Sequence, residues 1–209
     1  MRPRLVANAV QPLLVLGTLF LVAGFLSSRF GLLSAAVPLF LLAVGGFGVA
    51  VALALWRTPA TGMTLWAMRM AFGGLAVTVL LGTLLAESLA RGLAVPMIEL
   101  TNIHLAWGLG GWALMLLAGV SYHVVPMFQL TRPYPPWFTR WFAPLLLVLL
   151  LAWSSRIFFG HARWSALIAL PLLLILSAYA GITLWLQYTR RRKIHDATSL
   201  CFRVAMLSL

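Results

Sequence analysis

Six long runs of apolar residues, separated by short polar or turn-forming stretches, constrain the fold of this chain more than any other feature. The runs lie near residues 5–26, 33–55, 64–86, 101–127, 141–160 and 164–188. An α-helix needs roughly 20 apolar residues to cross a hydrocarbon core of about 30 Å, and each run has about that length. The sequence therefore predicts an all-α fold, a polytopic membrane helical bundle of about six transmembrane helices.

The composition agrees with a chain whose main partner is the lipid bilayer. Hydrophobic residues make up 63% of the chain and charged residues 9%, whereas soluble domains average about 45–50% apolar and about 25% charged residues. The net charge of +12 does not indicate a nucleic-acid partner, because the basic residues stand singly between apolar runs except at 190–193. A face that binds nucleic acid needs a folded polar surface, which this chain lacks.

The positions of lysine and arginine predict that both termini are cytoplasmic. One side of the predicted topology carries eleven of these residues, and the other carries four, at Arg29, Arg91, Arg156 and Arg163. Basic residues beside transmembrane helices remain in the cytoplasm, so the richer side is the cytoplasmic one. Arg69 and Arg156 lie inside two of the runs, near an end, and we expect their long side chains to extend to the headgroups.

The chain divides into a six-helix transmembrane domain at residues 1–189 and a basic cytoplasmic segment at 190–209. The first run, 5–26, is longer than the apolar core of about 7–15 residues in a cleavable signal peptide, so we expect it to be retained as a helix. The last residues, 200–209, are apolar again but too few to cross a bilayer. They form either an interfacial tail or the start of a truncated seventh helix, and the missing length favours truncation.

Ionisable residues inside a membrane are costly, and they therefore mark candidate functional sites. The three acidic residues, Glu87, Glu99 and Asp196, lie in loops or at helix ends. This placement disfavours a carboxylate relay of the kind that a proton pump uses. The fourth run holds two of the four histidines, His104 and His123, and it is the most informative segment of the chain.

His104 is the main candidate for a cofactor ligand. At about 100° per residue, Gly108 and Gly111 lie on the same helix face as His104, and the face continues to Met115. Small residues beside a histidine leave room for a flat macrocycle, so this face predicts a haem with His104 on the iron and both glycines at the porphyrin edge. The alternative is that the glycines only let a neighbouring helix approach, with His104 hydrogen-bonded at that interface.

The other histidines are weaker candidates. His123 follows His104 by 19 residues, about 28 Å along a helix, so the two imidazoles cannot bind one metal ion. We expect His123 to lie near the cytoplasmic surface, hydrogen-bonded to water, and we keep it only as a minor candidate for a metal ligand. His161 and His195 fall in loops, where we expect them to be solvated.

A resemblance to a known family is carried by the run from His104 through Gly110-Gly111-Trp112-Ala113-Leu114 to Tyr122-His123-Val124-Val125. This run resembles the second core helix of the catalytic subunits of haem–copper oxidases and nitric-oxide reductases. It is still more similar to uncharacterised bacterial membrane proteins related to that subunit. In the superfamily this helix runs from the outer to the inner face and carries an axial histidine of the low-spin haem near its outer end. The resemblance therefore implies haem b at His104 and a bacterial cytoplasmic (inner) membrane.

The chain lacks histidines that the family uses in its active site. It has no adjacent pair of histidines for copper, and no second intramembrane histidine at the depth of His104. We therefore do not expect this chain alone to reduce oxygen or nitric oxide, and any enzymatic role would be as part of a membrane oxidoreductase. The resemblance implies that a second haem ligand comes from missing C-terminal helices or another membrane subunit, or that the iron is five-coordinate. Thr101 or Asn102 is expected to orient the imidazole.

The leading hypothesis is a haem-binding, oxidase-like membrane protein that serves electron transfer, gas sensing or haem handling. One alternative is a permease or channel component, in which glycine-rich faces such as 45–46 and 73–74 surround a polar path. The near absence of charged or amide side chains at mid-membrane weakens that alternative. Another alternative is a non-catalytic assembly subunit that only packs against a larger membrane complex.

Overall fold

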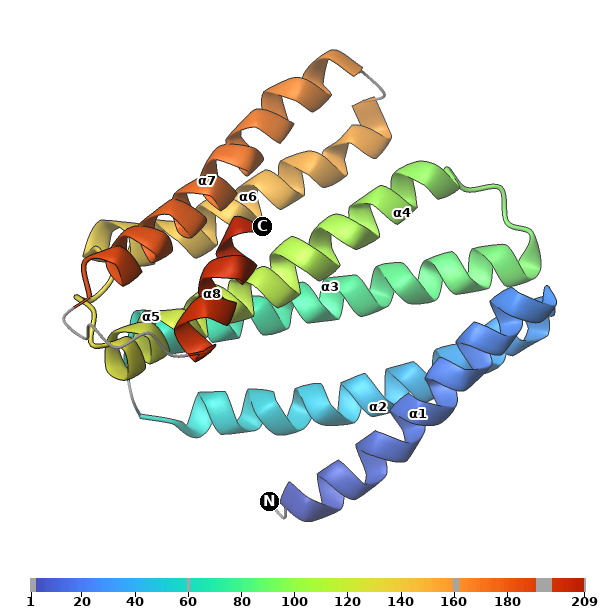
Figure 1. The fold of residues 1–209 in the computed structure, drawn as a ribbon. Helices are drawn as coiled ribbons and strands as arrows, with labels where there is room; N and C mark the ends of the chain where they lie inside the picture. Colours follow the sequence, from blue (N-terminus) through green and yellow to red (C-terminus); the bar gives the residue numbers. More distant parts are fainter. Residues whose placement is uncertain (1–2, 60, 160–161, 191–196, 209) are drawn as a thin grey trace. The chain divides into compact units, whose positions relative to one another are not determined.

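The computed structural model describes residues 3–59, 61–159, 162–190 and 197–208, and these residues form helices joined by short connections (Figure 1). The helices are α1 (Pro3–Ser27), α2 (Phe30–Arg57), α3 (Met63–Arg91), α4 (Met97–Ala106), the π-helical segment η1 (Trp107–Leu114), α5 (Met115–Gln129), α6 (Pro136–Phe159), α7 (Ala162–Tyr188) and α8 (Ala197–Leu207). No strand occurs among the described residues, and the all-α prediction is confirmed.

Six helical stretches are long and apolar enough to cross a membrane. They are Val6–Ser27, Phe30–Arg57, Met63–Arg91, Met97–Gln129, Pro136–Phe158 and Ser165–Tyr188. The predicted polytopic bundle of about six transmembrane helices is therefore confirmed, and the chain is a helical membrane protein. Several of these stretches extend past the predicted apolar runs. Arginine and other polar side chains at the helix ends can reach the headgroup region. The backbone can therefore stay helical there and keep its hydrogen bonds.

The fourth stretch is not a continuous α-helix, because α4 passes into η1 at Trp107 before α5 begins at Met115. A π-helix bonds residue i to residue i+5, so it places more residues in each turn than an α-helix does. Three glycines fall in this segment, WGLGGWAL, and glycine weakens the preference for α-helical backbone. The expected single face from His104 to Met115 assumed α-helical winding throughout, and it does not continue as predicted beyond Trp107.

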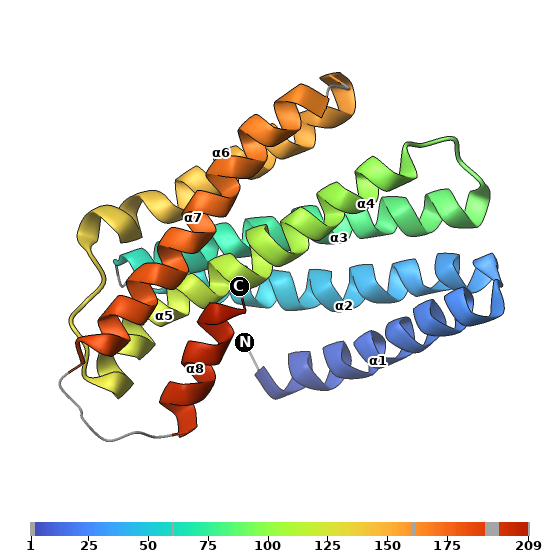
Figure 2. The ribbon, with the colours of Figure 1, turned by 45° about the horizontal axis from the view of Figure 1, so that its top comes forward.

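The chain forms two compact units, and the first comprises Met1–Ala60 and Phe72–Gly108. In this unit α1 and α2 form an antiparallel hairpin (Figure 2). Two glycines of α1 permit the close contact: a Cβ built on Gly17 would lie 3.3 Å from the ring of Phe40, and one on Gly24 would lie 2.6 Å from Cδ2 of Leu33. The fully buried Leu33 is part of this interface.

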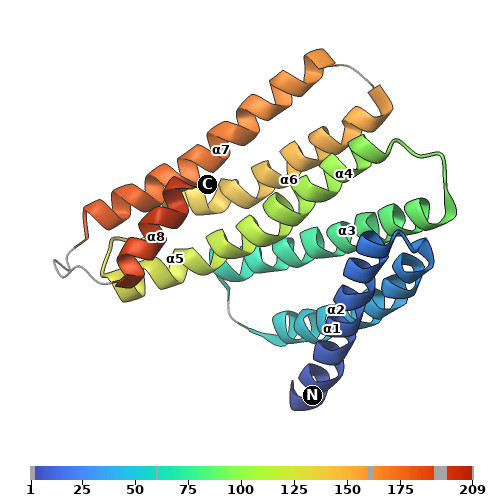
Figure 3. The same ribbon diagram turned by 45° about the vertical axis from the view of Figure 1, so that its right-hand side comes forward.

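The second unit comprises Thr61–Ala71 and Leu109–Leu209. Here the first turns of α3 pack against α5 where Gly119 removes a side chain, since a Cβ on Gly119 would lie 2.9 Å from the Cβ of Ala67. The helices α6 and α7 form an antiparallel hairpin (Figure 3). The guanidinium of Arg156 lies 4.0 Å from the centroid of the Trp153 ring, one turn earlier in α6.

The last described helix, α8, turns back beside α7 in a roughly antiparallel direction (Figures 1 and 3). Its start is held by a hydrogen bond of 2.7 Å from Nη1 of Arg190 to Oγ of Ser199. The 11 residues of α8 rise by about 16 Å, roughly half the thickness of a hydrocarbon core. A seventh transmembrane helix that continues from α8 stays a prediction.

Candidate functional site

His104 lies on α4 and faces α3 within the first unit. Its Nδ1 is 3.0 Å from the backbone carbonyl oxygen of Thr78. A carbonyl oxygen only accepts hydrogen bonds, so Nδ1 must carry the proton and donate it. In the neutral ring, Nε2 is then the nitrogen with a free lone pair. This is the arrangement in which a histidine usually binds a metal, with the second nitrogen held by a carbonyl group.

Gly82 on α3 makes the approach of the imidazole possible. A Cβ on Gly82 would lie 3.0 Å from Cε1 and 3.5 Å from Nδ1 of His104. Gly82 follows Thr78 by one helical turn, and the hydroxyl of Thr78 donates to the carbonyl oxygen of Gly74, a turn earlier. Neither Thr78 nor Gly82 was predicted from the sequence as part of the site. The spacing of Gly74, Thr78 and Gly82, four residues apart each time, is a small-residue pattern that predicts close helix packing and was available as a signal.

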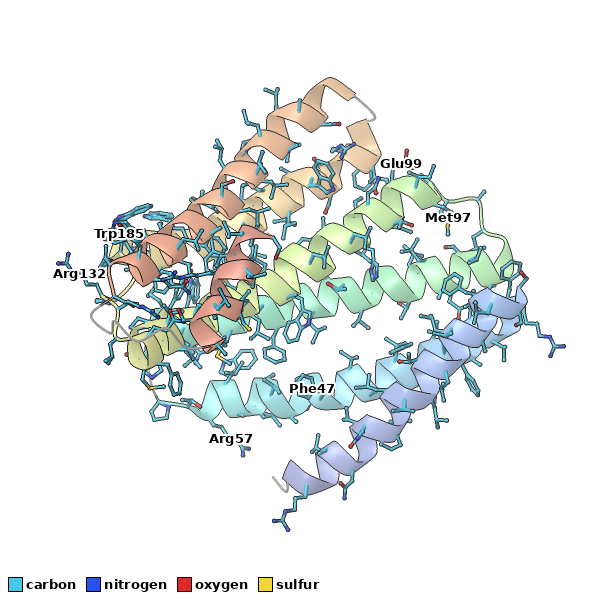
Figure 4. The ribbon with its side chains drawn as sticks, in the orientation of Figure 1. Phe47, Arg57, Met97, Glu99, Arg132 and Trp185 are labelled. Carbon is cyan, nitrogen blue, oxygen red and sulfur yellow. The ribbon has the colours of Figure 1, made fainter. Side chains whose placement is uncertain are left out.

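A cavity of about 540 Å³ lies beside His104, with walls from α1, α2, α3 and α4. This volume falls in the range of about 300–1,000 Å³ that ligand pockets occupy. Most of the lining side chains are apolar, including Phe25, Phe40, Leu89 and Met97, and Figure 4 labels Met97 near the start of α4. The half-buried imidazole of His104 therefore borders an apolar space large enough for a cofactor.

The two glycines predicted to admit a porphyrin edge lie elsewhere. A Cβ on Gly108 would be 3.3 Å from Cγ2 of Thr78, so Gly108 permits close packing of η1 against α3. Gly111 is buried and belongs to the second unit. Neither glycine is among the described residues that line the cavity at His104. Their part in haem binding stays a prediction, and the packing observed at Gly108 agrees with the alternative of close helix approach.

The polar neighbours expected to orient the imidazole are both exposed. Of the two, Thr101 also lines the cavity, and Asn102 is the next residue of α4. Instead, Nδ1 of His104 donates its hydrogen bond to the backbone carbonyl oxygen of Thr78 on α3. Sequence patterns do not report such a bond, because every residue carries a carbonyl group and only packing selects one of them.

His123 lies on α5, in the second unit, with an exposed side chain. Among the described residues, no group of three or more histidine, cysteine, aspartate or glutamate side chains is placed to hold a metal ion. The role of His123 as a metal ligand stays a minor prediction. His161 and His195, expected to be solvated, lie outside the described residues, as does Asp196.

A buried chain of hydroxyl groups crosses the second unit between α5, α7 and the loop before α6. The hydroxyl of Thr183 donates to the carbonyl oxygen of Tyr179 (2.7 Å) and lies 3.0 Å from the hydroxyl of Tyr134. The hydroxyl of Tyr179 lies 3.0 Å from that of Ser121. Tyr134 is in the loop outside the membrane-spanning stretches, where burial raises the pKa of its phenol and the hydrogen bond to Thr183 lowers it in part. The phenol is therefore protonated and uncharged at neutral pH.

Replacing Tyr134 by phenylalanine should lower the melting temperature by about 2–4 °C, because a buried hydrogen bond contributes about 1 kcal/mol. Tyr134 is 4% exposed, so bulk water does not reach the hydroxyl of Thr183 to replace the lost partner. The matched control is Tyr188→Phe on α7, where the ring is 86% exposed and no change is expected. Thermal unfolding of the two variants in one detergent measures the difference. Equal melting temperatures would contradict the bond between Tyr134 and Thr183.

Comparisons of the chain with protein-family models, with curated proteins and with solved structures found no match.

Proposed function

We propose that this protein binds a b-type haem in the membrane, with Nε2 of His104 as an axial ligand of the iron. The observation that carries the proposal is the hydrogen bond from Nδ1 of His104 to the carbonyl oxygen of Thr78. In the neutral tautomer that this bond selects, the lone pair is on Nε2, and His104 lines the 540 Å³ apolar cavity. The residues present fit the group, since they supply one oriented nitrogen ligand and apolar walls for a macrocycle.

The protein contributes orientation and surroundings to this site. The Thr78 carbonyl holds the imidazole in one tautomer and one orientation. Phe25, Phe40 and Leu89 give the cavity apolar walls, and apolar surroundings change the reduction potential of a bound iron centre. When bound, haem supplies reversible one-electron transfer or the binding of a small gas molecule. Electron transfer, gas sensing and haem handling are the functions consistent with one protein ligand.

A haem at this site would be held either by His104 alone or by His104 together with a second protein ligand. The resemblance to oxidase catalytic subunits supports a ligand from further helices or from another membrane subunit. The lack of an adjacent histidine pair argues against oxygen or nitric-oxide reduction by this chain alone. We place the protein in a bacterial cytoplasmic membrane on the same resemblance.

A reduced-minus-oxidised visible spectrum of the purified protein tests the proposal. The protein from haem-replete cells should show haem bands, and the bands should be lost in His104→Ala. The matched control is His123→Ala, which removes an exposed imidazole from the second unit and should leave the spectrum unchanged. A colourless wild-type protein that also fails to take up added haemin would overturn the proposal. The assembly-subunit or permease hypotheses would then take its place.

A further inference from the structure

Near the ends of α5 and α7, the second unit contains a group of buried, uncharged polar side chains. The proposed haem site does not use them. Tyr122 and Gln129 lie on α5, Tyr134 lies in the loop that follows, and Thr183 and Gln187 lie on α7. The ring of Tyr122 packs edge-on against Tyr134, with 5.2 Å between centroids. Figure 4 labels Arg132 and Trp185 at this end of the unit, where the loop and the end of α7 meet.

The directions of the hydrogen bonds in this group follow from its geometry. Thr183 gives its one hydroxyl proton to the carbonyl oxygen of Tyr179, so Tyr134 must be the donor in its bond with Thr183. Ser121 gives its proton to the carbonyl oxygen of Leu117, so Tyr179 must be the donor in its bond with Ser121. Both phenols have therefore used their protons, and neither can donate to a further group.

Four polar atoms of the group have no hydrogen-bond partner among the described residues. They are Oη of Tyr122, Oε1 of Gln129, and both Oε1 and Nε2 of Gln187. Gln187 is 0% exposed and Gln129 is 6% exposed. Buried polar atoms in folded proteins nearly always have a partner, either protein or ordered water. These atoms comprise both donors and acceptors, so a molecule that both donates and accepts hydrogen bonds can pair with any of them.

We propose that the second unit holds a buried hydration site, in which ordered water molecules bind to Tyr122, Gln129 and Gln187. Water both donates and accepts, and it binds where two to four polar groups converge. The described side chains of the group are all uncharged, and an ion without an opposite charge nearby would be costly to bury. Phenol and carboxamide groups instead match the hydrogen-bonding capacity of a neutral molecule. The site lies where Gln129 ends α5.

Replacing each glutamine by methionine, which has a similar shape without polar atoms, tests the hydration site. If water binds, Gln187→Met removes partners from the bound molecules, and the melting temperature should fall by about 2 °C or more. Gln129→Met should lower the melting temperature by a similar amount, because it removes another hydrogen-bond partner of bound water. If the site is dry, methionine relieves unpaired buried atoms, so a higher melting temperature in both single variants would overturn the proposal. The matched control is Gln11→Met, at an exposed position of α1, with no expected change.

Hydroxyl-radical labelling of the unmodified protein by pulsed X-ray radiolysis gives a readout that does not depend on variants. Water bound beside Tyr122 should generate radicals in place, so Tyr122 should be oxidised at a rate within about threefold of Tyr188, whose ring is 86% exposed. A rate for Tyr122 more than tenfold below that of Tyr188 would overturn the hydration site. A melting temperature raised by added short-chain quinone, together with that slow labelling, would assign the group to a ring-bearing neutral ligand instead of water.

Discussion

Replacing Gly119 with leucine is expected to lower the melting temperature of the protein by about 6 °C or more. A Cβ at this position would lie 2.9 Å from the Cβ of Ala67 and 3.4 Å from the carbonyl oxygen of Thr64. Those atoms belong to the backbone and the first side-chain carbon of α3, so no change of rotamer relieves the overlap. The two helices must move apart within the second unit, and the cost exceeds the roughly 1–3 kcal/mol of a small overpacking change.

The matched control for this prediction is Gly181→Leu on α7. No heavy atom lies within 4 Å of a Cβ built on Gly181, and the position is exposed. Leucine is also a better helix former than glycine, so the control should melt at the wild-type temperature or slightly above it. Thermal unfolding in one detergent compares the two variants. If Gly119→Leu melted together with the control, the close contact of α3 with α5 would be wrong.

Replacing Gly82 with leucine is expected to displace the imidazole of His104 and to weaken haem binding by about 10- to 100-fold, the usual effect of losing an outer-shell partner of a metal ligand. A Cβ on Gly82 would lie 3.0 Å from Cε1 of His104, and the rest of a leucine side chain would enter the cavity that Gly82 lines. The bond from Nδ1 to the carbonyl oxygen of Thr78 would then be lost. A haemin titration followed by absorbance measures the affinity.

The control for Gly82 is Gly73→Leu on the same helix, where a built Cβ has no heavy atom within 4 Å. A second readout keeps this packing prediction separate from haem binding. In the haem-free protein, the ¹⁵N chemical shifts of His104 should report a proton on Nδ1, and the Gly82→Leu variant should lose that signature. Unchanged shifts in Gly82→Leu would contradict the placement of His104 against α3, whatever the haem titration shows.

The membrane bundle was predictable because the bilayer imposes one simple requirement on the chain. Each predicted run had the length of a membrane crossing, and the six stretches in the structure match the runs in order. The break between α4 and α5 was not predictable from that requirement, because a π-helical turn at Trp107–Leu114 keeps the segment helical and apolar. Only the backbone hydrogen-bond pattern distinguishes it from an α-helix.

The sequence predicted the histidine of the candidate site but not the residues around that histidine. His104 stood out because an ionisable side chain within an apolar run needs a reason to be there. Its partner is a backbone carbonyl of α3, and its cavity is lined by four helices. The buried glutamines of the second unit were also missed, because Gln129 and Gln187 lie at the ends of their helices. Tyr179, Thr183 and Gln187 repeat every four residues, and that spacing would have placed them together.

The amino-acid sequence by itself determined that this chain lies in a membrane, how many times its helices cross, and which histidine is the main candidate ligand. Those properties depend on the length of apolar runs and on single costly residues, which are local features of the chain. The tertiary structure alone decided which carbonyl group orients His104, which glycines make close contacts, and where unpaired polar atoms gather. Lipid-facing and helix-facing residues are equally apolar in this chain, so hydrophobicity does not record which helix is the neighbour.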